Sequence, residues 1–506
     1  MKKSFLRTLS VLLCLALLWS ASGLSASADT AGNTAGNTPF RLSVTVNGNT
    51  ATRRGFCWYT PSQCGSEVRL YALPDRTEAQ VTAVTEECEW EGSYMHKVTV
   101  SGLHPGTAYA YTVGDGTTWS EEGTFTTDNG DDELNFIAIA DVQAGSLDNF
   151  KKGADTLIAG FRTMPDADFV ANLGDFTNDS DNEQWNYYDT AFADLNRTYT
   201  LAPIAGNHDG FSVSNWFNNM FCLDTSESVE TKDGVNYSFD YSNAHFAVLN
   251  TNDIISVSLS QLQWLKNDMN STDKDWKIVL MHKSPFTLGK DGKWPDALYL
   301  QRSLAAVCDM CDVDLVISGH DHMYLRTKPL KGDRVSEDGT TYVLAGTAGS
   351  KRYEIRRFLK GYFLTTDKIA MLNIQKGGYG NYWNGTDWSS TRDTNVGGCF
   401  NTVSIKGGTL TFNSYILQDL ERDENGDALP GQEWVISNTD TYSVTKETGK
   451  NKITFTGDNT TSRAEYILGA VPSFLCLACY TLGEWLPKFF AMLPLLVYVY
   501  ITEDTF

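Results

Sequence analysis

Positive charge is scarce in this sequence of 506 residues, which has 40 Lys and Arg against 62 Asp and Glu and a formal charge of −22. A protein that binds nucleic acid needs a basic surface, so this composition argues against a nucleic-acid-binding function. The molecule as a whole would also repel a phosphate-bearing substrate. Any site for such a substrate must therefore supply its own local positive charge.

Two common enzyme motifs are also missing. The sequence has no G-x-x-x-x-G-K-[ST] loop, which leaves an ATPase unsupported, and no H-E-x-x-H motif, which counts against a zinc protease. Disorder is excluded by a hydrophobic fraction of 42% and by 25 Phe, 23 Tyr and 13 Trp. The length allows roughly three to four domains with sizeable cores.

Long apolar stretches occur only near the two ends of the chain. At the start, Lys2, Lys3 and Arg7 precede an apolar stretch that ends near Trp19, and the small residues Ala26-Ser27-Ala28 follow. This pattern is typical of a secretory signal peptide over residues 1–28. A membrane anchor is the alternative, but the apolar stretch is short for a span.

Residues 466–506 form the second apolar segment, which charged residues and prolines interrupt. Each of its runs is short for a membrane span and no basic cluster follows, so membrane attachment and a partner-facing segment both stay open. We expect an exported protein, either extracellular or held at the cell surface through this tail.

Export permits disulfide bonds, and the ten cysteines fall to nine once the signal is removed. Cys57, Cys64 and Cys88 are close in the sequence, so one pair among them is expected. Cys308-x-x-Cys311 lacks a second Cys or His pair at zinc-finger spacing. We interpret it as packing or as a local disulfide.

The chain between the two ends divides into a front and a rear region. Residues 29–39 repeat a TAGN unit and predict a linker. Short alternating runs over 40–128, separated by turn residues, predict an all-β sandwich. Apolar strand-like runs alternate with longer segments over 132–446, which predicts an α/β layered unit. A linker is expected over 447–465, and the Gly- and aromatic-rich segment 377–388 is expected to be a loop.

Chemically active side chains follow five of the apolar runs in the rear region. In chain order they are Asp141 with Gln143, Asp175 with Asn178, Asn207-His208-Asp209, His282, and His320 with His322. Layered α/β folds build sites at the carboxyl ends of strands. A carboxylate can bridge two divalent ions, while neutral imidazoles and amide oxygens complete their shells without excess negative charge. Singly each residue would be an ordinary cap, but the ordered set favours a two-metal site.

The order D-x-Q, G-D-x-x-N, G-N-H-D, H, G-H-D-H resembles the signature of calcineurin-like metallophosphoesterases over about residues 133–350. The stretch from Leu103 to Tyr111 resembles the L-x-P-G-T-x-Y-x-Y turn of fibronectin type III domains. Together, residues 40–446 resemble bacterial relatives of purple acid phosphatases. The resemblance implies a multidomain fold: an N-terminal fibronectin III-like β-sandwich, then an α/β four-layer metallophosphoesterase β-sandwich flanked by helices.

The resemblance also implies a role for each motif residue. Asp175 would bridge two metal ions (Fe, Mn, Zn or Mg), and a hydroxide between them would attack phosphorus in line. The first ion would be bound by Asp141, Gln143 and His322, and the second by Asn207, His282 and His320. His208 would protonate the leaving group, with Asp209 orienting it.

Two residues depart from the family pattern. Gln143 replaces the usual histidine and can ligate only through its amide oxygen, so the first ion is expected to be loosely held or to be a harder cation. Asn178 stands where purple acid phosphatases have a ligand tyrosine. No iron–tyrosinate should form, and Asn178 is expected to position Asp175 or the substrate. His245, His96 and His104 lie outside the motifs and are expected to be structural.

The sequence therefore predicts a secreted or surface-attached, dinuclear metal-dependent phosphoesterase. Its substrate would be a phosphomonoester or phosphodiester, and the residues do not choose between them. The alternative is a non-catalytic cell-surface binding protein with a degenerate metal site. Gln143 favours that alternative, while the retained His208-Asp209 pair counts against it.

Overall fold

The computed structural model describes residues 36–447 apart from short internal segments. Those segments are residues 211–214, 230, 233, 253–259, 290–294, 333, 354–363, 377–378, 384–387 and 393–395. The predicted signal peptide, most of both predicted linkers and the apolar segment 466–506 lie outside the described residues. Within the described part, no helix combines the length and the apolar character needed to cross a membrane.

The front region is all-β, as predicted. One layer contains β1 (Phe40–Thr45), β2 (Arg53–Thr60), β6 (Ser93–Ser101) and β5 (Thr82–Trp90), and the other contains β4 (Thr77–Glu78), β3 (Glu67–Ala72), β7 (Ala108–Gly114) and β8 (Gly123–Thr126). Apolar side chains from both layers form one core, in which Phe56 and Trp58 of β2 share a cluster with Tyr109 and Tyr111 of β7. The two layers therefore form a sandwich.

Strand β2 is buried on both faces, which explains its nearly unbroken apolar sequence. Phe56 and Trp58 point into the front core, whereas Cys57 and Tyr59 belong to the large core of the rear region. Alternate residues of a strand point to opposite faces, so each face packs against a different unit. The front sandwich is thus fixed firmly to the rear unit.

The rear unit contains two large sheets. The first continues the front layer into ten strands, because β1 pairs in parallel with β11 (Leu201–Pro203) at Thr45 and Leu201. Its other rear strands are β10 (Phe169–Asn172), β9 (Glu133–Ile139), β23 (Val396–Lys406), β24 (Thr409–Gln418) and β25 (Ile436–Thr445). The nine-stranded second sheet runs in the order β12 (Tyr237–Tyr241), β13 (Ala244–Leu249), β14 (Trp276–Lys283), β15 (Leu315–Gly319), β19 (Thr341–Ala345), β16 (Tyr324–Thr327), β20 (Ile369–Lys376), β21 (Tyr379–Trp383) and β22 (Trp388–Arg392).

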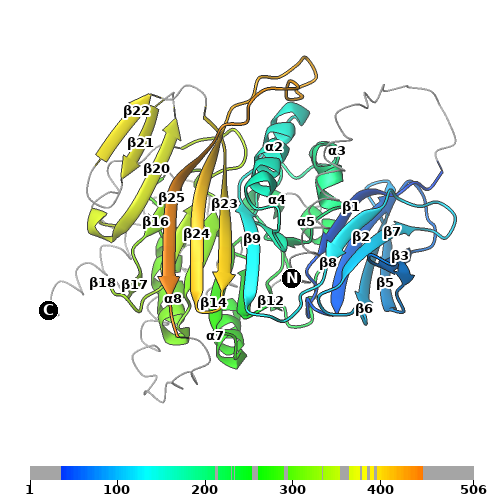
Figure 1. Ribbon diagram of the computed structural model, residues 1–506, viewed down its shortest axis with the longest axis horizontal. Helices are drawn as coiled ribbons and strands as arrows, with labels where there is room; N and C mark the ends of the chain where they lie inside the picture. The colour runs from blue at the N-terminus through cyan, green and yellow to red at the C-terminus, as the bar shows by residue number, and fades with distance from the viewer. Residues whose placement is uncertain are drawn as a thin grey trace, which may run out of the picture.

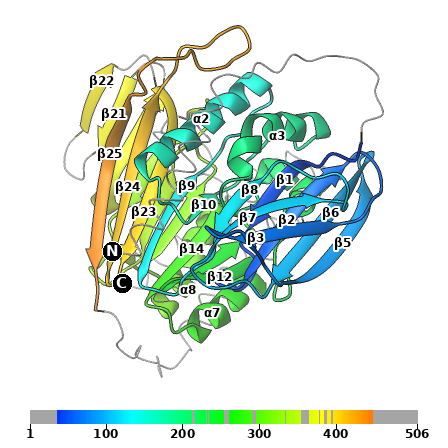
Figure 2. The ribbon, with the colours of Figure 1, turned by 45° about the vertical axis from the view of Figure 1, so that its right-hand side comes forward.

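Helices cover the outer faces of these sheets (Figures 1 and 2). Helices α2 (Leu147–Thr163) and α3 (Asn182–Asn196) lie against the first sheet, and α7 (Leu262–Ser271) and α8 (Pro295–Cys311) lie against the second. The shorter elements are α4 (Asn207–Gly210), α5 (Trp216–Met220), the 3₁₀ helix η5 (Thr366–Lys368), and the strand pair β17 (Leu330–Lys331) and β18 (Arg334–Val335).

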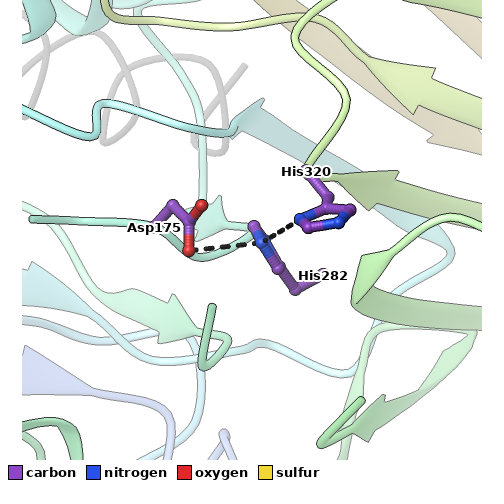
Figure 3. Close-up of side chains that lie close together, drawn as sticks. All are labelled: Asp175, His282 and His320. Carbon is purple, nitrogen blue, oxygen red and sulfur yellow. Dashed lines mark hydrogen bonds and ion pairs between the residues drawn. The ribbon is translucent and has the colours of Figure 1, made fainter. Parts of the chain in front are cut away.

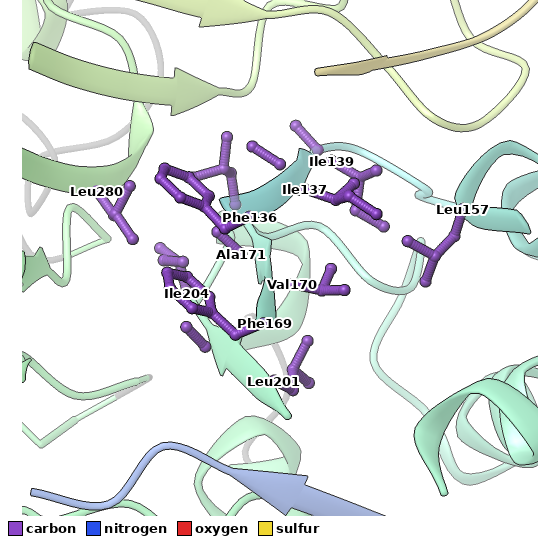
Figure 4. Packing of buried hydrophobic residues seen from close by; sticks show 14 of the residues in the cluster. Phe136, Ile137, Ile139, Leu157, Phe169, Val170, Ala171, Leu201, Ile204 and Leu280 are labelled. Atoms are coloured by element: carbon purple, nitrogen blue, oxygen red, sulfur yellow. The ribbon is translucent and has the colours of Figure 1, made fainter. Parts of the chain in front are cut away.

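Alternate side chains of β9 and β10 point to opposite sides and fill the spaces between the layers. Figure 4 shows Phe136 and Phe169 on the side of Leu280 in the second sheet, and Ile137 and Val170 on the side of Leu157 in α2. The Phe136 and Phe169 rings stack with centroids 4.9 Å apart. Both faces of these central strands are buried, which is why their sequences are continuously apolar.

Two expectations about local structure are corrected. The segment 377–388 is not simply a loop, because β21 lies within it and pairs antiparallel with β22, which begins at its end. The seven cysteines in the described residues are all free thiols. Cys57 and Cys88 lie on β2 and β5, and β6 runs between these strands. Two strand spacings are about 9–10 Å, beyond the reach of a disulfide. Cys308 and Cys311 are buried in the core beside α7, so packing is their role.

Candidate metal centre

Five strand ends bring the predicted site residues to one edge of the two sheets. Strands β9, β10 and β11 run parallel in the first sheet, and β14 and β15 run parallel in the second. Asp141 and Gln143 follow β9, Asp175 follows β10, Asn207 follows β11, His282 is near the end of β14, and His320 and His322 follow β15. The carboxyl ends of parallel strands meet at one edge, so residues distant in sequence come together.

The first set of donors centres on His282 Nε2 and is called here the Asn207 group: Asn207, Asp175, His282 and His320. From this nitrogen, Asn207 Oδ1 lies at 3.1 Å. Asp175 Oδ1 and His320 Nδ1 each lie at 3.2 Å from it (Figure 3). Ligands bound to one ion at about 2.0–2.2 Å lie about 3–3.4 Å from each other. The Asn207 group therefore has the donor types and spacing that suit a divalent cation.

The second set is called the Gln143 group: Asp141, Gln143, Asp175 and His322. One ligand atom from each of Asp141, Asp175 and His322 fits within a 4.8 Å cluster, and His322 Nε2 lies 3.8 Å from Asp141 Oδ1. Gln143 is buried and its Oε1 has no hydrogen-bond partner. A buried amide oxygen without a partner is costly unless it binds something, and a hard cation would satisfy it. The Gln143 group therefore also fits a metal ion, and Asp175 belongs to both groups.

Backbone carbonyls orient the histidines of both groups. His282 Nδ1 lies 2.8 Å from the Leu173 carbonyl oxygen, and His322 Nδ1 lies 3.3 Å from that of Lys351. A proton on each Nδ1 would satisfy these carbonyls, and each Nε2 is then the ring atom that faces its donor group. Such outer hydrogen bonds fix the tautomer and direction of metal-binding imidazoles.

The backbone of the site is held in unusual conformations. Positive φ angles occur at five non-glycine site residues, namely Asp141 (56°), Gln143 (37°), Asp175 (54°), His320 (82°) and His322 (37°). L-residues rarely adopt this region, and such strain concentrates at functional sites. Gly206 is required for a different reason, because a Cβ there would lie 2.0 Å from the Asp175 backbone nitrogen.

Burial and mutual charge separate the pKa values of the site residues. Burial, together with the charge of Asp175, raises the pKa of Asp141 well above its ordinary value. Burial opposes the Asp175 charge as well, but His282 and the other histidines outweigh it and lower the Asp175 pKa. Burial lowers the pKa of His322 to about 3, so this imidazole is neutral and its lone pair is free. A bound cation would relieve the repulsion between these buried carboxylates.

His208 is half-exposed, as are Asn207 and His320, whereas the other donors are buried. Its backbone N–H donates to Asp175 Oδ1 at 2.8 Å, and its Nδ1 lies 2.5 Å from the Asn178 carbonyl oxygen. Asp209 was expected to orient His208. In the structure its carboxylate instead accepts from the backbone N–H groups of Phe176 at 2.9 Å and Gly206 at 2.9 Å. Asp209 thus joins the loops after β10 and β11, while the Asn178 carbonyl orients the imidazole.

Sequence reasoning missed two residues of the rim. Lys351 donates through Nζ to Asn178 Oδ1, and the Tyr353 ring stacks on His322 with centroids 4.2 Å apart. Both residues follow β19, whose run TYVLAGTAG ends at the same edge as the other five. That sixth strand end was a usable signal, although it carries no acidic or histidine ligand.

Other residues outside the motifs have structural partners. His245 lies between Asp240 and Asp268, at 2.7 and 2.8 Å. His96 is buried and stacks on Trp58 at 5.1 Å, whereas His104 is exposed. Tyr324 and Arg326 both bind Asp440, at 2.7 and 2.6 Å.

Comparisons with known proteins agree with this architecture. Residues 134–324 match the family model of the calcineurin-like phosphoesterases, and residues 39–127 match the purple acid phosphatase N-terminal domain. The chain therefore carries a calcineurin-like phosphoesterase domain behind a purple acid phosphatase N-terminal domain.

Individual relatives are distant. The chain is 24% identical to purple acid phosphatase 21 of Arabidopsis thaliana over 53% of this chain and 61% of the relative. It is 22% identical to acid phosphatase type 7 of Danio rerio over 53% of this chain and 68% of the relative. A solved structure of PhoD shares the fold with a TM-score of 0.52 at 13% identity, covering 87% of this chain and 99% of that one. The chain thus spans about three fifths of the plant relative's length.

Proposed function

We propose that this chain is a metal-dependent phosphoesterase with two metal ions in its site. One observation carries the proposal: donors from five strand ends converge into two groups that share Asp175. The Asn207 group would hold one ion through Asn207, His282 and His320. The Gln143 group would hold the other through Asp141, Gln143 and His322. When bound, two such ions supply an activated water and neutralise charge on a transferring phosphoryl group.

The remaining steps belong to side chains at the rim. His208 would donate a proton to the leaving-group oxygen from Nε2, because its Nδ1 is engaged by the Asn178 carbonyl. Positioned general-acid help of this kind is typically worth about 10²–10⁴-fold in rate. Asp209 would act indirectly, since its contacts keep the loops of Asp175 and Asn207 at a fixed separation.

The proposed domain arrangement follows the same reasoning. We take 40–128 as the front domain, of fibronectin type III kind, and 132–446 as the catalytic domain. The sandwich core and the layered helices support this division, although one sheet runs through both units.

We also propose that residues 1–28 direct export of the chain, which is then either extracellular or held at the cell surface through residues 466–506. The support is the pattern of charge and apolar residues in the sequence. Amino-terminal sequencing of the mature protein and fractionation of cells expressing the chain with and without residues 466–506 would test this. A mature protein that starts before residue 29 would contradict removal of the signal, and unchanged fractionation without the tail would favour the extracellular form.

The function itself is tested by assaying the full chain against p-nitrophenyl phosphate and bis-p-nitrophenyl phosphate, metal by metal. The key variant is His208→Ala, and the matched control is His104→Ala, which removes an exposed imidazole from the front domain. We expect metal-dependent turnover that falls by about 10²-fold or more only in His208→Ala. Folded, metal-loaded protein without turnover would instead indicate a binding protein with a relict site.

A further inference from the structure

We infer that Lys351 is an anion-binding residue of the site, and that it makes the site selective for phosphomonoesters over phosphodiesters. The inference rests on the proposed function. Lys351 contacts two parts of the site at once. Its Nζ donates to Asn178 Oδ1, and its carbonyl oxygen lies 3.3 Å from His322 Nδ1. The ammonium group therefore contacts Asn178, whose carbonyl oxygen contacts His208, and the Lys351 backbone contacts His322 of the Gln143 group.

The segment that carries Lys351 is held firmly in place. The Gly349 N–H donates to the Asp141 carbonyl oxygen at 3.3 Å. Arg352 donates to the carbonyl oxygens of Gly349 at 2.7 Å and Lys351 at 2.8 Å, and its other nitrogen contacts the Gly397 carbonyl. Lysine side chains lose considerable rotamer freedom when they bind, so anchoring the backbone lowers the entropy cost of fixing the charge.

The surroundings of Lys351 distinguish this charge from an ordinary surface cation. The four donors of the Gln143 group are buried, whereas His208, Asn178 and Lys351 are half-exposed. Among the described residues, the Asp179 carboxylate interacts with the Lys351 charge, and it also accepts from Asn178 Nδ2 at 2.8 Å and from Gln184 Nε2 at 2.8 Å. In a chain with a formal charge of −22, a cation held at this rim supplies the local attraction that an anionic substrate needs.

The choice of ester follows from charge. A phosphomonoester presents a dianionic phosphoryl group, whereas a diester carries a single negative charge. Coulomb attraction to one fixed ammonium group scales with the charge of the ligand, so Lys351 favours the monoester. Because the contact is with a phosphoryl oxygen that is present before and after reaction, it should strengthen binding of the substrate and of inorganic phosphate more than it accelerates the chemical step.

The test compares Lys351→Met and Lys351→Gln with the wild-type full chain. We expect KM for p-nitrophenyl phosphate and the inhibition constant of inorganic phosphate to rise about 10- to 100-fold, with kcat changed less than about threefold. KM for bis-p-nitrophenyl phosphate should rise clearly less. Lys351→Arg should restore most of the phosphate affinity. Lys151→Met, which removes a cation paired with Asp427 on an outer loop, should change none of these values.

Two results would overturn the inference in an active enzyme. One is an unchanged inhibition constant for phosphate, and the other is an equal rise of KM for both esters. The double variant Lys351→Met/Asp179→Asn tests whether Lys351 serves only to neutralise Asp179. In that case the double variant should regain the wild-type affinity for phosphate, whereas our inference predicts that its affinity stays weakened.

Calorimetric titration of inorganic phosphate into the metal-loaded chain keeps this inference distinct from the proposed function. If no ester is hydrolysed by the wild type, the proposed function fails. Weaker phosphate binding in Lys351→Met would still support the anion site, and equal binding would overturn it.

Discussion

The two donor groups share Asp175 but differ in how completely they are assembled. In the Asn207 group, three partner atoms lie 3.1–3.2 Å from His282 Nε2, and two of its members are imidazoles. In the Gln143 group, His322 Nε2 and Asp141 Oδ1 are 3.8 Å apart, and an amide oxygen replaces a second imidazole. A compact group with more nitrogen donors binds borderline cations such as Zn²⁺ more tightly. In the proposed two-metal site, Asp175 would therefore join a tightly binding position to a weakly binding one.

The largest effect should come from removing the shared ligand. Asp175→Asn takes the charge from both groups at once, so both ions should be weakened or lost. Losing transition-state charge stabilisation worth several kcal/mol corresponds to an activity loss on the order of 10³-fold or more. Metal content and turnover should fall together, measured by elemental analysis and ester hydrolysis.

Asp338→Asn provides the matched control for that variant. This exposed carboxylate pairs with Lys331 at 2.7 Å, far from the strand ends that form the site. It should retain wild-type metal content and activity. An Asp175→Asn variant that keeps both ions and full activity would contradict the shared position.

The two groups should also differ in how tightly they bind their metal ions. Gradual chelation of the Zn²⁺-loaded chain should release two ions in separate steps, the weaker one from the Gln143 group. Gln143→His should raise the affinity of the weaker position about tenfold or more, because imidazole is a better donor to Zn²⁺ than an amide oxygen. A single release step in the wild type, or an unchanged metal affinity in Gln143→His, would contradict the expected difference in affinity between the two groups.

The sequence was informative about the site because metal ligands need particular residue types at strand ends. Asp141, Asp175 and His282 were predicted from apolar runs that end in polar residues, and the structure brings their side chains together. Contacts of the backbone could not be predicted in this way. The Asn178 carbonyl at His208 and the Leu173 carbonyl at His282 depend on loop conformation, which side-chain identity does not encode.

The fold, like the site, was predictable from the sequence only in part. Alternating runs predicted the front β region, and near-continuous apolar runs predicted the buried rear strands. It did not predict that β1 and β11 would pair across the domain boundary at Thr45 and Leu201, because pairing between distant strands depends on how whole layers meet. The pair expected among Cys57, Cys64 and Cys88 was wrong for a related reason, since closeness in sequence placed Cys57 and Cys88 on strands that are not adjacent.

A histidine outside both groups provides a smaller contrast. His282 and His322 each present one nitrogen to a carbonyl and the other to a donor group, whereas both nitrogens of His245 face carboxylates. Burial opposes the His245 cation, but the bonds to Asp240 and Asp268 outweigh it and raise the pKa to about 9. Burial opposes the His282 cation as well, but Asp175 and Asp141 outweigh it and raise the His282 pKa to about 9. His245 and His282 therefore differ in their contacts and not in the direction of their pKa shifts.

The contribution of His245 to stability should therefore depend on pH with a defined sign. The folded-state pKa is above the unfolded value of about 6.5, so the stabilisation is complete below that pH and is lost as pH rises through 9. The amount is roughly 1–2 kcal/mol after allowing for the half-exposed Asp240 carboxylate. Denaturant melts of wild type and His245→Gln should converge above pH 9 and separate below 6.5. Parallel curves across this range would contradict the prediction.

The smallest expected effect is the absence of a colour. Asn178 occupies the position of the ligand tyrosine in purple acid phosphatases, and its side chain contacts Lys351 and Asp179 rather than a donor of the Gln143 group. Without a phenolate, no iron–tyrosinate charge-transfer band should appear. Iron-loaded chain with its iron content verified by elemental analysis should therefore show no such band in the visible spectrum. A distinct band would mean that another tyrosine reaches the ion. That result would contradict the weaker binding expected of the Gln143 group, because a phenolate is a stronger ligand than the amide oxygen of Gln143.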